Sequence, residues 1–121
     1  MQQPSEDAAV ADVKQDPQAA VITVSKRTLG VLQAMYPATV EERHSSVDWD
    51  AFVQSMDKAG FFAKNGGGSI VTFERVSGEG KIAFHRPHPE PKIDPVMLQS
   101  MGRRMNKWFG WTRESFALAE K

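Results

Sequence analysis

The chain has 121 residues, of which 40% are hydrophobic, so its length fits one domain with a small core. It contains no cysteine, which excludes disulfides, a thiolate zinc site and a cysteine nucleophile. No apolar run approaches the roughly 20 residues that span a bilayer, and the N-terminus lacks a basic start with an apolar core. We therefore expect an intracellular protein, in the cytoplasm, with no membrane partner.

The formal net charge is zero, but the charges are unevenly distributed along the chain. Residues 1–16 carry four acids and one lysine, whereas residues 58–113 carry ten Lys and Arg residues against four acids. Residues 1–20 are also rich in Gln, Ala, Asp and Pro and show no apolar periodicity. We interpret them as a flexible tail or a linker, and residues 21–121 as the domain.

A short extended segment in residues 20–24 and then a helix are predicted at the start of this domain. Ser25 is suited to cap the helix, because its hydroxyl oxygen can accept a hydrogen bond from a free backbone N–H. Leu29 and Leu32 begin an apolar stripe at three-to-four spacing, and Pro37 ends the helix.

Thr39 and Glu42 match a capping box, which indicates either one further turn or only a role in shaping the loop. The clearest predicted helix follows this box. Ser46 or Asp48 is the expected cap of this helix, and Gly60 is its stop. Its apolar residues recur at i, i+3, i+4 and i+7: Trp49, Phe52, Val53 and Met56.

Three strands are predicted in the middle of the chain. The first begins at residues 61–62, the second covers the β-prone run 70–76, and the third covers residues 82–85. Glycines between the runs permit tight turns, and the glycine run 66–68 lacks the Lys and Ser/Thr of a phosphate-binding P-loop. Since side chains alternate along a strand, His85 is expected to face away from the apolar side of the third strand.

The last main helix is predicted to begin at Asp94 and Pro95, because Asp can cap free N–H groups and Pro has none to lose. Its buried stripe is expected to consist of Met97, Leu98, Met101, Met105 and Trp108. Thr112 is predicted to cap a short terminal helix that carries Phe116 and Leu118. The methionines are interpreted as core residues.

The order of these elements is α-β-β-β-α, which predicts an α+β fold. We expect a three-stranded antiparallel sheet packed on one face by two helices. An extra N-terminal helix and a short C-terminal helix complete the predicted architecture.

Two histidines, His85 and His88, are the candidate catalytic residues, because imidazole can take or give a proton near neutral pH. Arg86 lies between them and can fork onto phosphate oxygens, while Pro87 and Pro89 restrict the loop. The alternative is that this loop has only a structural role, in which the prolines stiffen the connection to the last helix.

Other residues are candidates for metal or phosphate binding. The two histidines with Glu90 or Asp94 offer zinc-ligand types, but their spacing matches no zinc motif, so we predict no metal and no cofactor. A surface for nucleic-acid phosphate is predicted from the basic residues, with ordinary solubilising charge as the alternative. These residues are Lys64, Lys81, Arg86, Lys92, Arg103, Arg104 and Lys107.

Several stretches together resemble a HicA-like domain, the toxin fold of bacterial HicA–HicB systems. They are DWDAFVQSMDKAGF, the GGS that opens a strand, IAFHRPHP, KIDPVMLQSMG and the closing GWTRESF. The HicA-like resemblance covers about residues 47–108. Residues 25–118 are more similar still to fungal domains of this type, often found at the C-terminal end of larger cytoplasmic proteins. The resemblance implies a double-stranded-RNA-binding-domain-like fold and, in the bacterial family, ribonuclease activity.

The resemblance also implies where a catalytic histidine would stand, after a Gly-Ser pair at the start of the second strand. Gly68 and Ser69 match that pair, but Ile70 occupies the histidine position and cannot transfer a proton. The favoured hypothesis is therefore a non-catalytic binding module for RNA or a protein partner. The alternative is a ribonuclease, similar to an mRNA interferase toxin, that uses His85 or His88.

Overall fold

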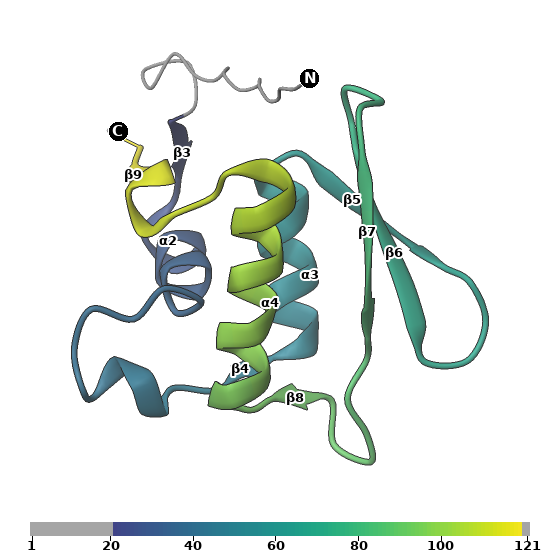
Figure 1. Ribbon diagram of the computed structural model, residues 1–121, viewed down its shortest axis with the longest axis horizontal. Helices are drawn as coiled ribbons and strands as arrows, with labels where there is room; N and C mark the ends of the chain where they lie inside the picture. The colour runs from purple at the N-terminus through teal and green to yellow at the C-terminus, as the bar shows by residue number, and fades with distance from the viewer. Residues whose placement is uncertain (1–20, 120–121) are drawn as a thin grey trace, which may run out of the picture.

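The computed structural model describes residues 21–119, so the predicted tail or linker in residues 1–20 lies outside the described residues. The described chain has an α+β fold, in which a three-stranded sheet is covered on one face by α3 and α4 (Figure 1). The helices are α2 (Lys26–Gln33), α3 (Trp49–Lys58) and α4 (Pro95–Phe109). The sheet strands are β5 (Phe61–Asn65), β6 (Ile70–Arg75) and β7 (Lys81–His85). The predicted fold class is confirmed.

The sheet is an antiparallel meander in the order β5-β6-β7. Positive φ angles of 100° at Gly67 and 61° at Gly68 shape the turn between β5 and β6. Ile82 and Phe84 are buried, whereas His85 is exposed, as the alternation of side chains predicts. His85 therefore points to the side of β7 opposite to Ile82 and Phe84, at the edge of the sheet that β7 forms.

A cluster of aromatic rings fixes the sheet against α3. Phe52 of α3 is 0% exposed, and its ring centroid lies 5.6 Å from that of Phe73 and 6.0 Å from that of Phe84. Both contacts are edge-to-face, the geometry that the ring quadrupoles favour. Trp49 adds a further edge contact to Phe73, at 5.9 Å. These rings form the centre of the core.

The first two helices begin where the sequence predicts. The Ser25 side chain accepts from the Thr28 N–H at 3.3 Å at the start of α2. Asp48 occupies the N-cap position of α3 but makes no capping hydrogen bond through its side chain. Instead, the backbone N–H of Trp49 donates to the Pro91 carbonyl at 2.8 Å. The predicted side-chain cap of α3 is therefore not formed, and the first N–H group of the helix is satisfied by the loop before α4.

Two pairs of short strands join segments that are distant in sequence. The strand β4 (Val47–Asp48) pairs antiparallel with β8 (Lys92–Ile93), and β3 (Ile22–Val24) pairs parallel with β9 (Phe116–Leu118). The extended segment predicted near residues 20–24 is thus confirmed for its described part.

The C-terminal segment differs from its prediction. Thr112 caps only a single 3₁₀ turn, η3 (Arg113–Ser115), and the prediction that Phe116 and Leu118 lie on a helix is wrong. The extended backbone pairs with β3 and directs the Phe116 ring into the core, where its centroid lies 4.9 Å from that of Trp111. Burial of this ring and pairing with β3 outweigh continuation of the helix.

Helix α4 begins at the predicted cap, since Asp94 Oδ1 accepts from the Met97 N–H at 2.8 Å. It ends before Gly110, whose φ is 72°. The prediction that Trp108 is buried is wrong, because its side chain is 63% exposed. Phe109 packs against Phe61 instead, with 4.9 Å between ring centroids. Position 109, four residues after buried Met105, lies nearer the centre of the buried stripe, whereas position 108 lies at its edge.

Gly102 allows α4 to approach the end of α2 closely. A Cβ atom at this position would lie 2.6 Å from the backbone oxygen of Met35 and 3.1 Å from Cε1 of Tyr36. The Tyr36 hydroxyl donates to the Gly102 carbonyl at 2.8 Å, and burial raises the pKa of Tyr36 far above its usual range. This phenol therefore stays a neutral donor, and the contact needs the smallest residue at position 102.

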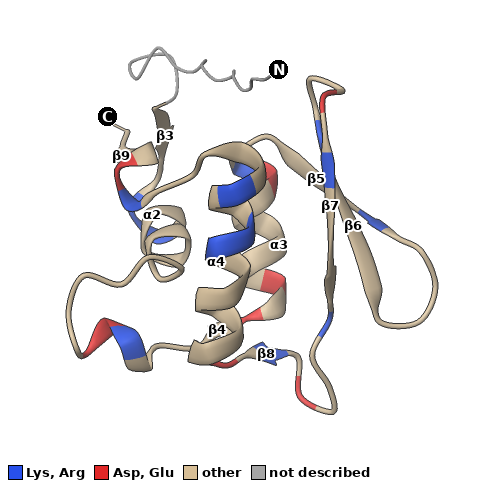
Figure 2. Cartoon of the chain, in the orientation of Figure 1, with Lys and Arg blue, Asp and Glu red and all other residues tan. Residues whose placement is uncertain are grey.

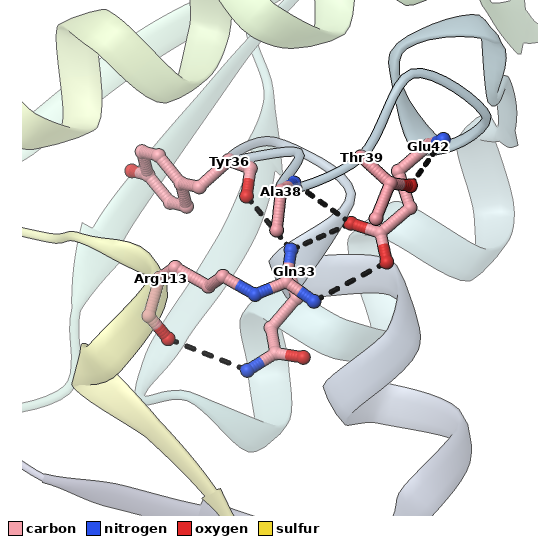
Figure 3. Close-up of polar contacts among 6 residues, drawn as sticks. All are labelled: Gln33, Tyr36, Ala38, Thr39, Glu42 and Arg113. Carbon is pink, nitrogen blue, oxygen red and sulfur yellow. Dashed lines mark hydrogen bonds and ion pairs between the residues drawn. The ribbon is translucent and has the colours of Figure 1, made fainter.

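The C-terminal segment is tied to the loop after α2 by one arginine (Figure 3). Arg113 donates to both carboxylate oxygens of Glu42, at 2.6 and 3.3 Å, and to the Tyr36 carbonyl at 2.9 Å. Glu42 also accepts from the Ala38 N–H at 3.0 Å, while its own N–H donates to the Thr39 hydroxyl at 3.1 Å. The turn predicted from Thr39 and Glu42 is confirmed and continues into η2 (Glu42–His44).

Replacing Gly102 with alanine is expected to destabilise the protein by about 1–3 kcal/mol, because the added methyl group meets the backbone oxygen of Met35, which cannot rotate away. The matched control is Gly30→Ala in α2, where an added Cβ meets nothing within 4 Å. That change should stabilise the protein by about 0.5–1 kcal/mol through helix propensity. Urea unfolding measures both variants, and equal effects of the two substitutions would contradict this account of Gly102.

Replacing Glu42 with glutamine should lower stability at pH 7. Hydrogen bonds from Arg113 and from the Ala38 backbone hold the pKa of Glu42 below its usual value. A lowered folded-state pKa stabilises the fold fully above the unfolded-state pKa, about 4.3, and the benefit is lost as the pH falls through the folded-state pKa. Thermal unfolding of wild type and variant should therefore differ at pH 7 and converge in acid. Glu41→Gln, the same change one residue away, should leave no such pH-dependent difference.

Candidate functional site at the end of strand β7

His85 is the last residue of β7 and lies directly opposite Ile70 of β6 in the strand register. Its Nδ1 atom is 3.2 Å from the hydroxyl oxygen of Ser69, which immediately precedes β6. The next residue, Arg86, donates its backbone N–H to the Ser69 carbonyl at 2.7 Å. The turn before β6 and the histidine loop after β7 are therefore fixed to one another by two hydrogen bonds that both involve Ser69.

A small hollow of about 300 Å³ opens at this junction. It is lined by Gly68 and Ser69 from the turn and by Arg86 and His88 from the loop. Its lining residues carry a hydroxyl, a guanidinium and an imidazole, and no acid is among them. This set of donors suits a phosphate group, because the guanidinium can fork onto two of its oxygens.

A second hollow, of about 420 Å³, lies between the end of β7 and the first half of α4. His85 and Phe84 line it from the sheet, and Arg104 lines it from the helix. Since Ser69 lines the first hollow and His85 the second, the Ser69–His85 pair stands between them. The remaining lining residues of the second hollow are Asp94, Val96, Met97, Ser100 and Met101.

Arg104 is fixed in place by the sheet. Its Nη1 donates to the Ala83 carbonyl at 2.9 Å, and its guanidinium carbon lies 4.9 Å from the centroid of the Phe84 ring. The residue nonetheless remains exposed. An arginine held this way loses less side-chain entropy when it meets an anion, because its position is already set.

The other predicted phosphate-binding residues fall into two groups. Arg103 and Lys107 lie exposed on α4 with Arg104, and Figure 2 shows blue positions on the side of this helix that faces the viewer. Lys64 lies on β5, separated from β7 by β6, with its Nζ 3.5 Å from Glu74. Lys92 lies on β8 and lines a different hollow. Lys64 and Lys92 are therefore not brought together with the two histidines.

The hollow that Lys92 lines has a mixed charge. It measures about 480 Å³ and includes Arg27 together with three carboxylates, those of Asp48, Asp50 and Glu90. Asp94, the other acid considered as a metal ligand, is the cap of α4. Within residues 21–119, no three His, Asp or Glu side chains form a group that could hold a metal ion.

The hydrogen bond between Ser69 and His85 was not predicted from the sequence. The length of the turn after β6 contained the necessary signal, because a hairpin closed by the backbone bond from Arg75 N–H to the Gly80 carbonyl sets Ile70 opposite His85. The exposure of Trp108 was missed as well, since its position also fits an apolar stripe in the sequence.

These features define a small α+β domain with two histidines at one end of an antiparallel sheet. In a comparison with protein families, residues 49–106 match the family model described as the HicA toxin of bacterial toxin-antitoxin systems. The matched segment runs from the first residue of α3 through the sheet and most of α4, just under half of the chain. The predicted HicA-like domain is thereby confirmed in residues 49–106.

Nothing among the curated proteins or the solved structures matches the chain. The similarity to fungal domains and the double-stranded-RNA-binding-domain-like assignment stay predictions. The family match does not include α2, the β3–β9 pair or Arg113, so these elements lie outside the matched segment. None of the helices in residues 21–119 has the length and apolar character that crossing a membrane requires.

Proposed function

We propose that this HicA-like domain is a binding module for RNA, and that it binds through the end of β7 and the exposed side of α4. The observation that carries the proposal is the charge of α4. This helix exposes Arg103, Arg104 and Lys107, which we call the α4 basic face, and its 15 residues include no acid. Clustered cations without intervening acids attract the phosphate backbone of a nucleic acid.

The first hollow extends this surface beyond the helix. Arg86 and His88 line it, and Arg104 lines the adjoining hollow, so cationic or proton-donating groups border both sides of the Ser69–His85 pair. A strand of RNA that followed the α4 basic face toward the end of β7 would place successive phosphates against these groups. Ile70, at the position of the family's histidine, supports binding without the family's own route of cleavage.

A ribonuclease is the second candidate function, and the pairing of Ile70 with His85 favours it. Directly opposed residues in an antiparallel pair have Cβ atoms about 4.5–5.5 Å apart, so His85 could replace the family's histidine from the neighbouring strand. In RNA cleavage, the Nε2 atom of His85 would accept the proton of a 2′-hydroxyl as its oxygen attacks the adjacent phosphorus. His88 would give a proton to the departing 5′-oxygen, and Arg86 would stabilise the negative charge on phosphate.

RNA binding should weaken steeply as salt increases, because phosphate contacts release counterions. The double variant Arg103→Ala with Lys107→Ala is expected to reduce the slope of log K against log salt by roughly 1.4, about 0.7 per contact with a single strand. Arg104 is left intact since it also contacts the sheet. Lys26→Ala is the matched control and should leave the slope unchanged, because α2 lies on the side of α3 and α4 that is away from the sheet (Figure 1). No binding by the wild type at low salt would refute the proposal.

The two candidate functions predict different results with labelled RNA. For a binding module, the RNA stays intact on long incubation. For a ribonuclease, cleavage follows a bell-shaped pH profile, and His85→Ala and His88→Ala each reduce its rate by about 100-fold or more. Cleavage that persists undiminished in both alanine variants would show a contaminating nuclease. Ile70→His, which places a histidine opposite His85, tests whether cleavage can be restored in an inactive wild type.

A further inference from the structure

Trp108 is an exposed aromatic side chain in a chain that buries its other tryptophans. Its side chain is 63% exposed, whereas Trp49 and Trp111 are 3% and 4% exposed. An indole is among the largest apolar surfaces that a residue can present, and its π-face can stack on another flat ring. The position of Trp108 near the C-terminal end of α4 places this ring on the same helix as the proposed RNA-binding residues.

The surroundings of the Trp108 ring are cationic. The ammonium nitrogen of Lys107 lies 5.5 Å from the ring centroid. Arg104 lies one helical turn earlier, about 6 Å along the axis of α4. Val96, another strongly exposed apolar side chain of α4, is twelve residues away, about 18 Å along the same axis. Along α4, the ring is therefore an exposed apolar surface next to positive charges, with no other strongly exposed apolar side chain of this helix nearby.

We infer that Trp108 stacks on an unpaired base of RNA whose phosphates contact the α4 basic face, an inference that rests on the proposed RNA binding. A nucleotide combines a flat π-system with an adjacent anion, and this combination complements an indole beside an ammonium group. On α4, a protein partner would find only this apolar ring beside cations, without the surrounding apolar contacts that exclude water around a hot spot. The bases of a duplex are already stacked, so the occupant is a single strand.

Tryptophan fluorescence reports on this contact directly. Because Trp49 and Trp111 are buried, the emission that a dissolved quencher reaches belongs to Trp108. Addition of a 12-nucleotide oligouridylate at low salt should quench this emission, and Trp108→Phe should remove the change while keeping most of the affinity. Trp108→Ala should weaken binding roughly 5- to 100-fold. Since the side chain is exposed, both variants should unfold at the same urea concentration as the wild type.

An abasic oligomer of the same length separates stacking from phosphate binding. It should bind with the same dependence on salt, produce no quenching, and bind wild type and Trp108→Ala equally. If oligouridylate binds without quenching and Trp108→Ala binds it equally well, the stacking role is refuted while the proposed RNA binding stands. If neither oligomer binds at low salt, both proposals fail. If the wavelength of the Trp108 emission changes with protein concentration in the absence of RNA, Trp108 lies in a protein interface. That result would overturn the inference.

Discussion

The edge-to-face packing of Phe52 against Phe73 and Phe84 is the contact on which the rest of the molecule depends. It places one face of the sheet against α3 and so decides which side chains of β7 are buried. Because β7 is pleated, burying Phe84 forces His85 outward. The meander then sets His85 beside Ile70 and within hydrogen-bonding distance of Ser69. The geometry of the candidate site thus follows from the packing of the core on the opposite face.

The same packing connects the core to the proposed binding surface. One face of the Phe84 ring is covered by the guanidinium of Arg104, which also bonds to the β7 backbone. Arg104 therefore contributes both to the contact between α4 and the sheet and to the α4 basic face. A helix anchored in this way presents Arg103, Lys107 and Trp108 from a rigid support, which lowers the ordering cost of binding.

Features that depend on a local pattern of residues could be predicted from the sequence. Alternation along β7 predicted that His85 faces outward, and the Asp94–Pro95 pair predicted the start of α4. Two features that depend on contacts between distant segments were predicted wrongly, those of Phe116 and Trp108. The extended conformation of Phe116 depends on pairing with β3, more than 90 residues earlier, and no local signal distinguishes it from a helical residue. Trp108 fits a helical stripe by spacing, but the sheet-facing position is filled by Phe109, whose partner Phe61 lies on a different element.

The parallel pairing of β3 with β9 makes the two ends of the described chain one structural unit. Ile22 lies opposite Phe116, and the Ala119 N–H donates to the Val24 carbonyl at 2.8 Å. Each strand supplies backbone hydrogen-bond partners to the other, so removal of either would take these partners away from its neighbour. The folding unit is consequently larger than the segment that matches the family model, residues 49–106. Truncation of the chain at the boundaries of this match would remove paired strands of the domain.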